Sequence, residues 1–225
     1  MNINKYILVF LFVIFFIYII CKCNNINRCN NEYFTIKDKQ KVYLDMLKKT
    51  KNALNRLNIP FFLSSGTCLG YYREGKFIDH DYDIDIGIFK KDYTIKIIKE
   101  MKKEGFILYR VWGKLDSGLE LSFRLPKTPL GKRAKIDIFV HYNTDKHTSW
   151  YSYAPKKKKK IHYSVSRFGI KDIDFMGVTV GVPDPTLRYI QEHYGNDWFI
   201  PKKKKDYKYY LDPKSIVQDK IAREK

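Results

Sequence analysis

Apolar residues run without a break from Ile7 to Ile20, and this pattern predicts a helix that is buried in lipid rather than half-buried in a protein core. These 14 residues would span about 21 Å as a helix, which is shorter than a hydrocarbon core of ~30 Å. Such a length is typical of a signal-peptide core or a short signal anchor. Because no small-residue cleavage site follows, we expect an uncleaved membrane-anchor helix at residues 1–23 and a polar stem at residues 24–40.

A different pattern begins at Lys41, where apolar residues recur at helical spacing with lysines between them. This predicts a helix that ends near Asn58 and Pro60. The apolar positions of this helix are Val42, Leu44, Met46, Leu47, Ala53, Leu54 and Leu57.

Short runs rich in apolar residues follow and predict strands. The segment from Tyr82 to Phe89 alternates acidic residues with isoleucine, as expected of a strand with one active face. Together with two further helices, the strands indicate an α+β (α/β) domain at residues 41–225 with a mixed sheet flanked by helices. The other predicted strands are Pro60–Leu63, Phe106–Trp112, Leu119–Leu125 and Lys135–His141, and the helices are Tyr93–Lys103 and Pro185–His193, the latter capped by Asp184 and followed by Gly195.

The composition excludes a disordered chain, because 44% of residues are hydrophobic and 16% are aromatic. The formal net charge is +19, which favours contact with nucleic acid, anionic lipid or phosphorylated substrates. A surface solvated by many lysines explains the same charge. The lysine runs at 156–160 and 202–205 are expected on exposed loops.

Four cysteines are present, and three of them, Cys21, Cys23 and Cys29, cluster after the apolar segment. No second pair lies at metal-ligand spacing, so no zinc site is predicted. Cys21 and Cys23 are candidates for palmitoylation or for pairing between chains, or are unmodified residues beside the anchor.

The first motif with possible chemistry is the Ser- and Gly-rich segment Ser64–Gly70, directly after the first predicted strand. Glycine lets backbone amides approach an anion, and the start of a following helix favours negative charge. Ser65, Gly66 and Thr67 are therefore candidate phosphate-binding residues. Many strand-to-helix turns also use Ser and Gly without binding anything.

The second motif is the acidic segment Asp81-Tyr82-Asp83-Ile84-Asp85. Residues i and i+2 of a strand point to the same side, so Asp83 and Asp85 should converge, with Asp81 at the rim. Carboxylates this close repel one another unless a cation lies between them, and Mg²⁺ or Mn²⁺ prefers such oxygen ligands. A solvated acidic strand edge is the alternative.

The third motif places Asp137 inside an otherwise apolar strand. A buried carboxylate requires a partner or a metal ion. We therefore predict that Asp137 completes a metal site with Asp83 and Asp85, and that these three residues are catalytic in phosphoryl transfer.

In the order of these motifs, the chain resembles the LicD/fukutin family. The likeness extends from about Lys41 to Asp212. The residues that carry it are Pro60–Arg73, Phe77-Ile78, Asp83–Ile88, Leu119–Phe123, Lys135–Phe139, Tyr189-Ile190, Tyr194–Trp198 and Ile200-Pro201.

The resemblance implies a nucleotidyltransferase-like fold and the metal-dependent transfer of a phospho-alcohol from a CDP-linked donor to a hydroxyl of a glycan or glycoprotein. The transferred group is ribitol 5-phosphate in fukutin-like members and phosphocholine in LicD-like members. It also implies a single-pass anchor with the catalytic domain in the Golgi or ER lumen, although Lys22 and Arg28 after the apolar run favour the opposite orientation. Arg73 would bind the donor phosphate together with Gly66 and Thr67, or would form a structural ion pair. Ser65 and Asp81 are the other candidate substrate-binding residues.

Two other functions fit parts of the pattern. The same fold could transfer a nucleotide to nucleic acid, but a lumenal domain meets none, so we expect no nucleic-acid partner. A non-catalytic basic membrane protein that binds anionic lipid or glycan would not require the set of aspartates.

Overall fold

The computed structural model describes residues 14–20, 22, 39–128, 130, 134–154, 159–202, 214 and 216. The chain divides into two units, Met1–Lys39 and Gln40–Lys225. In the first unit, residues 14–20 are helical. No helix among the described residues is long and apolar enough to cross a membrane. Most of the predicted anchor and stem lies outside the described residues, so both remain predictions.

The second unit is a mixed sheet with helices, as the sequence predicts. Its described part forms nine strands in the order β3-β4-β5-β2-β1-β9-β8, with β6 beside β5 and β7 beside β6. The strands are β1 (Phe62–Leu63), β2 (Ile84–Phe89), β3 (Ile107–Trp112), β4 (Glu120–Arg124), β5 (Lys135–Asn143), β6 (His147–Ala154), β7 (Lys159–Ser166), β8 (Gly169–Phe175) and β9 (Val178–Asp184).

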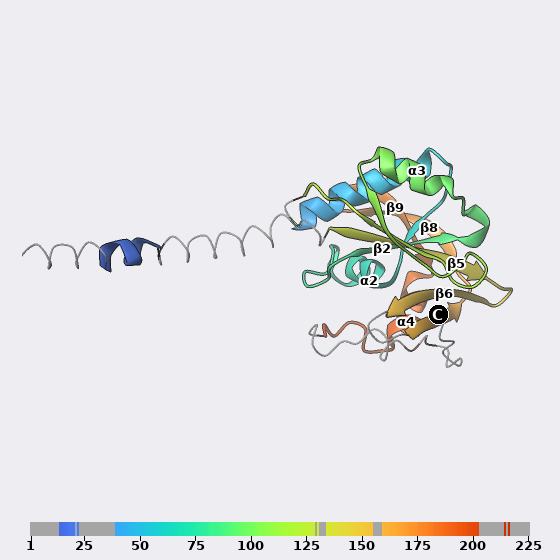
Figure 1. Cartoon of the computed structure of the whole chain (residues 1–225). Helices are drawn as coiled ribbons and strands as arrows, with labels where there is room; N and C mark the ends of the chain where they lie inside the picture. The colour runs from blue at the N-terminus through green and yellow to red at the C-terminus, as the bar shows by residue number, and fades with distance from the viewer. Residues whose placement is uncertain are drawn as a thin grey trace, which may run out of the picture. The chain divides into compact units, whose positions relative to one another are not determined.

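Helices cover the sheet on two sides (Figure 1). The helix at residues 40–55 and α3 (Lys96–Lys103) lie on one side, joined by the ion pair of Arg56 with Glu100 at 2.8 Å. On the other side lie α2 (Ser65–Glu74) and α4 (Thr186–Tyr194). A short 3-10 helix, η1 (Lys90–Asp92), follows β2.

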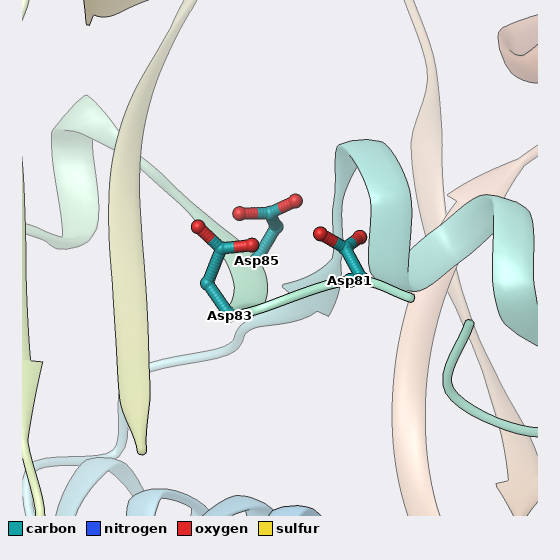
Figure 2. A group of neighbouring side chains, drawn as sticks. All are labelled: Asp81, Asp83 and Asp85. Atoms are coloured by element: carbon teal, nitrogen blue, oxygen red, sulfur yellow. The ribbon is translucent and has the colours of Figure 1, made fainter. Parts of the chain in front are cut away.

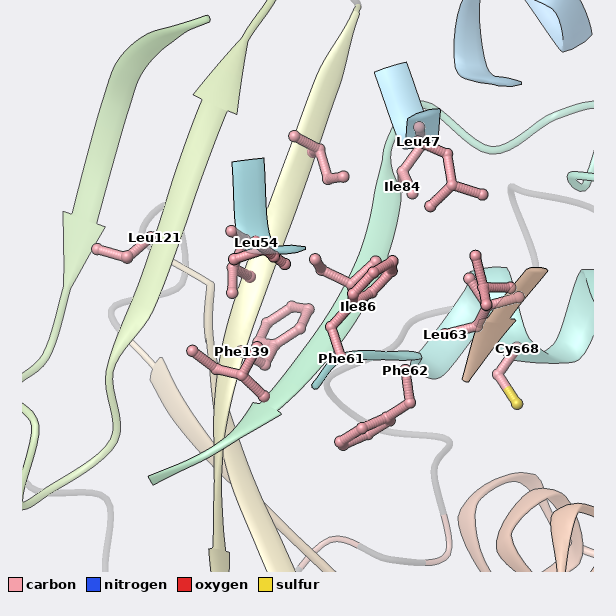
Figure 3. Packing of buried hydrophobic residues seen from close by; sticks show 14 of the residues in the cluster. Leu47, Leu54, Phe61, Phe62, Leu63, Cys68, Ile84, Ile86, Leu121 and Phe139 are labelled. Atoms are coloured by element: carbon pink, nitrogen blue, oxygen red, sulfur yellow. The ribbon is translucent and has the colours of Figure 1, made fainter. Parts of the chain in front are cut away.

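The centre of the sheet is its most buried part because β2 and β5 pair in parallel and are covered on both faces. Ile84, Ile86 and Ile88 of β2 are fully buried. Leu47 and Leu54 of the first helix belong to the same core cluster (Figure 3). This packing fixes the register in which Asp85 of β2 lies directly opposite Asp137 of β5.

Several predicted boundaries are wrong. The strand expected from Tyr82 begins at Ile84, so Asp81 and Asp83 lie in the segment before it. The segment expected as a turn, Ser65–Thr67, is already the first turn of α2. Asp184 does not cap α4, whose N-cap is Pro185 without a side-chain cap bond, and the Asp184 side chain contacts Lys171 instead.

The sequence reading assigned no element to residues 147–184, where the structure has the four strands β6–β9. The alternation in β7 was a usable signal, because Ile161, Tyr163 and Val165 are buried. Lys159 and Lys160 belong to this strand, so the lysine run at 156–160 does not lie wholly on a loop. Positions 203–205 of the second run lie outside the described residues.

Gly87 in β2 shows how tightly this centre is packed. A Cβ at this position would lie 2.4 Å from the Phe62 ring and 2.7 Å from Cε1 of His141. Both rings are fully buried and contact each other with centroids 4.8 Å apart, so neither can move away. We therefore expect Gly87→Ala to lower the free energy of unfolding by about 2 kcal/mol or more, measured by denaturant titration.

The matched control is Gly169→Ala, also in a strand of this sheet, where a Cβ meets nothing within 4 Å. It should leave the stability unchanged or raise it slightly. Equal effects of the two substitutions would contradict the packing described.

Candidate functional site

Three carboxylates meet at the start of β2. Asp81 and Asp83 lie in the segment before the strand and Asp85 is its second residue. Each offers an oxygen atom within 4.8 Å of the other two, and all three residues are partly buried. Figure 2 shows their side chains close together on one side of this segment. The prediction that Asp83 and Asp85 converge is confirmed, and Asp81 is a full member of the group rather than a residue at its rim.

The beginning of α2 holds this group in place. The backbone N–H of Gly66 donates to Oδ2 of Asp85 at 3.1 Å, and the backbone N–H of Asp85 donates to Oγ1 of Thr67 at 2.8 Å. A Cβ on Gly66 would lie 2.6 Å from Oδ2 of Asp81. Glycine is therefore needed here, because any side chain would displace the Asp81 carboxylate.

Asp137 lies beside this group but has a different partner. Nζ of Lys135 contacts Oδ2 of Asp137 at 2.5 Å and Oδ2 of Asp83 at 2.9 Å. Oδ1 of Asp137 is buried and has no hydrogen-bond partner among the described residues. Lys135 is therefore a cation within the acidic region, and the sequence analysis did not predict it.

A fifth acid, Glu120 on β4, is buried near Asp137. Ser122, two residues further along the strand, pairs in register with Asp137, and its hydroxyl donates to Oε1 of Glu120 at 3.5 Å. Glu120 is 6% exposed. The acids of β2, β4 and β5 thus form one buried, strongly negative region.

Burial and the charges of neighbouring groups shift the pKa values of the acids and of Lys135. Burial and the charges of Asp83, Asp81 and Asp137 raise the pKa of Asp85 well above its usual value. Burial, followed by the charge of Asp137, raises the pKa of Glu120 to about 8. Burial lowers the pKa of Lys135, but Asp137 and Asp83 raise it more, so the net shift is upward and Lys135 is charged at neutral pH.

The acidic group opens into a cavity of about 530 Å³. Arg73 lies at one side, where its guanidinium donates to Oε1 of Glu74 and, at 3.4 Å, to the backbone oxygen of Trp198. Aromatic residues form much of the remaining wall, and the rings of Trp112 and Tyr153 are stacked with centroids 5.7 Å apart. The aromatic lining residues are Tyr82, Trp112, Phe139, Trp150, Tyr153, Tyr163, Tyr194 and Trp198.

This donor set suits a hard divalent cation. Three carboxylate oxygens within ligand reach of one another, beside an accessible cavity, are the ligands that Mg²⁺ and Mn²⁺ prefer. The unsatisfied Oδ1 of Asp137 adds a buried acceptor in the lining of the same cavity. The residues present therefore fit a metal ion at Asp81, Asp83 and Asp85.

Comparison with known proteins places this chain in a family. A family model described as "LicD/FKTN/FKRP, nucleotidyltransferase domain" matches residues 58–185, which include all five acids. The chain belongs to this family. The family resemblance predicted from the motifs is thus confirmed.

The relatives include proteins named "Ribitol-5-phosphate transferase FKTN". The Macaca fascicularis protein is 39% identical over 165 residues, which are 73% of this chain and 34% of that protein. The Homo sapiens protein is 38% identical over the same shares. An uncharacterized Caenorhabditis elegans protein is 26% identical over 78% of this chain and 46% of its own length. The chain therefore spans about a third of the length of the named family members it matches.

Several polar groups of the predicted phosphate-binding residues already have hydrogen-bond partners within the protein. The Thr67 hydroxyl and the Gly66 amide already hold Asp85, and the Ser65 amide donates to the Tyr189 hydroxyl at 3.0 Å. Ser65, Gly66 and Arg73 line the cavity, whereas Thr67 is buried behind it. The motif thus positions the acids more than it offers amides to an anion.

Sequence reasoning missed Lys135 and Glu120 as members of the site. Both could have been found from strand alternation, since Lys135 and Asp137 lie two residues apart, as do Glu120 and Ser122. It also missed Tyr189, whose hydroxyl contacts Ser65 N and, at 3.2 Å, Oγ of Ser64. Tyr189 is among the residues that carry the family resemblance, but no local pattern gives it this role, because the contact depends on how α4 packs.

The raised pKa of Glu120 gives a pH-dependent prediction. A folded-state pKa of about 8 exceeds the unfolded value of about 4.3. The stability that Glu120 contributes is present below the unfolded pKa and is lost as the pH rises toward the folded pKa. In metal-free buffer, Glu120→Gln should therefore gain stability over the wild type between pH 5 and pH 8, by about 1.4 kcal/mol per pKa unit at most.

The measurement is the free energy of unfolding of both proteins at each pH, with EDTA present. Taking the difference removes the contributions of other titrating groups, such as His141 and His193, whose pKa values burial lowers to about 3. A difference that does not change between these pH values would contradict the description of Glu120 as a buried, charge-coupled acid.

Proposed function

We propose that this chain is a metal-dependent transferase that moves a phospho-alcohol, of the ribitol 5-phosphate type, from a CDP-linked donor to a glycan hydroxyl. The observation that carries the proposal is the group of Asp81, Asp83 and Asp85 at the edge of a cavity large enough for a nucleotide-linked substrate. Membership of the LicD/FKTN/FKRP family supports phosphoryl chemistry at this group.

Asp83 and Asp85, joined by Asp81, would hold Mg²⁺ or Mn²⁺. A bound ion supplies positive charge to the oxygens of the transferring phosphoryl group. The protein's own part is to keep three mutually repelling carboxylates in place, which it does with Gly66 and Thr67. This preorganisation is the form of catalysis that phosphoryl transfer needs most.

Asp137 would act on the acceptor rather than on the donor. One of its oxygens is held by Lys135, and the other, Oδ1, is buried without a hydrogen-bond partner among the described residues. An acceptor hydroxyl in the cavity would donate a hydrogen bond to Oδ1 and pass its proton there. Its oxygen would then bond to the β-phosphorus of the donor, while the bond from that phosphorus to the bridging oxygen breaks and CMP leaves. Burial raises the pKa of Asp137, which makes it a better base than an exposed aspartate.

The cavity offers contacts for the rest of the substrates. The Ser65 hydroxyl and the Arg73 guanidinium lie in its lining as donors for the diphosphate, although Arg73 must share its charge with Glu74. The flat faces of Trp112 and Tyr153 suit stacking of a base or packing of a sugar ring. We therefore expect the aromatic wall to contribute to the choice of donor and acceptor.

The choice of ribitol 5-phosphate follows the names of the FKTN relatives. Because the chain spans about a third of those proteins, the donor and the acceptor are both proposed rather than carried over. A basic chain of net charge +19 also suits a nucleotide transferase that acts on nucleic acid. A donor assay with CDP-ribitol, CDP-choline and CTP therefore separates the candidates.

We also propose that the apolar run Ile7–Ile20 anchors the chain as a single-pass protein with the catalytic unit in the Golgi or ER lumen. The run is short for a hydrocarbon core of ~30 Å, and a bilayer accommodates such a helix by thinning around it. The acids of the site lie far beyond it in the sequence, within the compact unit Gln40–Lys225.

The central test is Asp85→Asn in a transfer assay with Mn²⁺. The substitution keeps the size of the side chain but removes a charge and a strong metal ligand. Transfer should fall by at least about 10²–10³-fold, while metal-free stability stays equal or rises because one like charge is lost. Asp137→Asn should also lose activity, but it should lower the melting temperature because it breaks the ion pair with Lys135.

Asp116→Asn is the matched control, since Asp116 is 88% exposed and pairs with Lys90 outside the cavity. It should leave transfer unchanged. An Asp85→Asn protein that is active but unstable would contradict a catalytic role for Asp85, and full activity in excess EDTA would contradict the metal.

The anchor proposal predicts that deleting residues 1–24 releases a soluble protein that still transfers. Every residue of the proposed site lies in the unit Gln40–Lys225, so specific activity should match that of the full chain. Fractionation after a salt wash is the measurement. Truncated, folded protein that stays with the membranes would show that another part of the chain binds them.

A further inference from the structure

Lys135 occupies an unusual place for a lysine. It is the first residue of β5, its side chain is 22% exposed, and its ammonium lies between the carboxylates of Asp83 and Asp137. A lysine so enclosed loses hydration and is stable as a cation only because both carboxylates contact it. Its position is therefore set by these two acids.

The geometry resembles half of a two-metal site. Where two ions catalyse phosphoryl transfer, they lie about 3.5–4 Å apart and share a carboxylate. Asp83 belongs to both groups, because one of its oxygens lies within 4.8 Å of oxygens of Asp81 and Asp85, and its Oδ2 contacts Lys135 at 2.9 Å. It is therefore in the position of that shared carboxylate. Asp137 would be the outer ligand of a second ion, but its Oδ2 is already taken by Lys135.

We propose that Lys135 is a built-in cation that stands where a second metal ion would bind, so that the site takes a single Mg²⁺ or Mn²⁺ at Asp81, Asp83 and Asp85. The inference rests on the proposed metal site and adds its stoichiometry. Lys135 also keeps Oδ2 of Asp137 away from the ion, which leaves Oδ1 as the oxygen available to a ligand in the cavity.

The positive charge of Lys135 differs from that of a metal ion, because the lysine is part of the chain and the ion can exchange with solution. An ammonium contacts the same carboxylate oxygens that a metal ion would, but it has no open coordination position and cannot dissociate. Removing it leaves the partly buried Asp83 and the buried Asp137 close together without the lysine cation. Such a pair of carboxylates should recruit a divalent ion in its place.

The experiment counts the Mn²⁺ ions bound per full-length chain at saturation, from the electron paramagnetic resonance signal of free Mn²⁺. The wild type should bind one ion. Lys135→Met should bind two, and Lys135→Arg, which keeps the charge, should bind one. Lys90→Met is the matched control, because Lys90 forms an ion pair with Asp116 at 2.8 Å outside the cavity, and it should bind one.

Melting curves add a readout that does not depend on activity. Without metal, Lys135→Met should melt at a lower temperature than the wild type, because Asp83 and Asp137 lose their ion pairs with Lys135. Mn²⁺ should raise its melting temperature more than that of the wild type, since a second ion binds only the folded state.

Each count has a distinct meaning. Two ions in the wild type, or one in a cooperatively melting Lys135→Met protein, would overturn the role of Lys135 and leave the metal site standing. No bound ion in the wild type would refute the metal site of the proposed function. If Lys135→Met does not fold, the wild-type and Lys135→Arg counts decide, because two ions in either one contradicts the proposal.

Discussion

The repulsion between buried carboxylates is the constraint on which the rest of this site depends. Asp81, Asp83, Asp85, Asp137 and Glu120 are brought into one region of the sheet, and Lys135 contacts two of them. A protein gains no stability from such crowding, since each acid raises the pKa of its neighbours. The arrangement is explained if the site is built for a cation and for phosphate oxygens.

Strand pairing and core packing hold the crowded carboxylates in place. Parallel pairing of β2 with β5 sets Asp85 opposite Asp137, and β4 brings Glu120 beside them. Tight packing around Gly87 keeps the strands from shifting in register. The first turn of α2 then fixes Asp85 through Gly66 and Thr67. The positions of the acids therefore depend on the packing of the core, and a substitution that disturbs the sheet should also disturb the site.

The sequence predicted the parts of this arrangement that depend on local pattern. The alternation of acid and isoleucine located β2, and a lone acid in an apolar run located Asp137 on its neighbour. It did not predict that Lys135 bridges two acids or that Thr67 binds a backbone amide, because both contacts follow from how strands and helices pack. The four strands at 147–184 were missed, although the alternation of buried and partly buried residues in β7 was visible in the sequence.

The most direct test is an anomalous difference map from crystals soaked in Mn²⁺. We predict one peak, in contact with carboxylate oxygens of Asp81, Asp83 and Asp85, with the Lys135 ammonium still between Asp83 and Asp137. A peak between Asp137 and Glu120, or no peak at the three aspartates at saturating Mn²⁺, would contradict it.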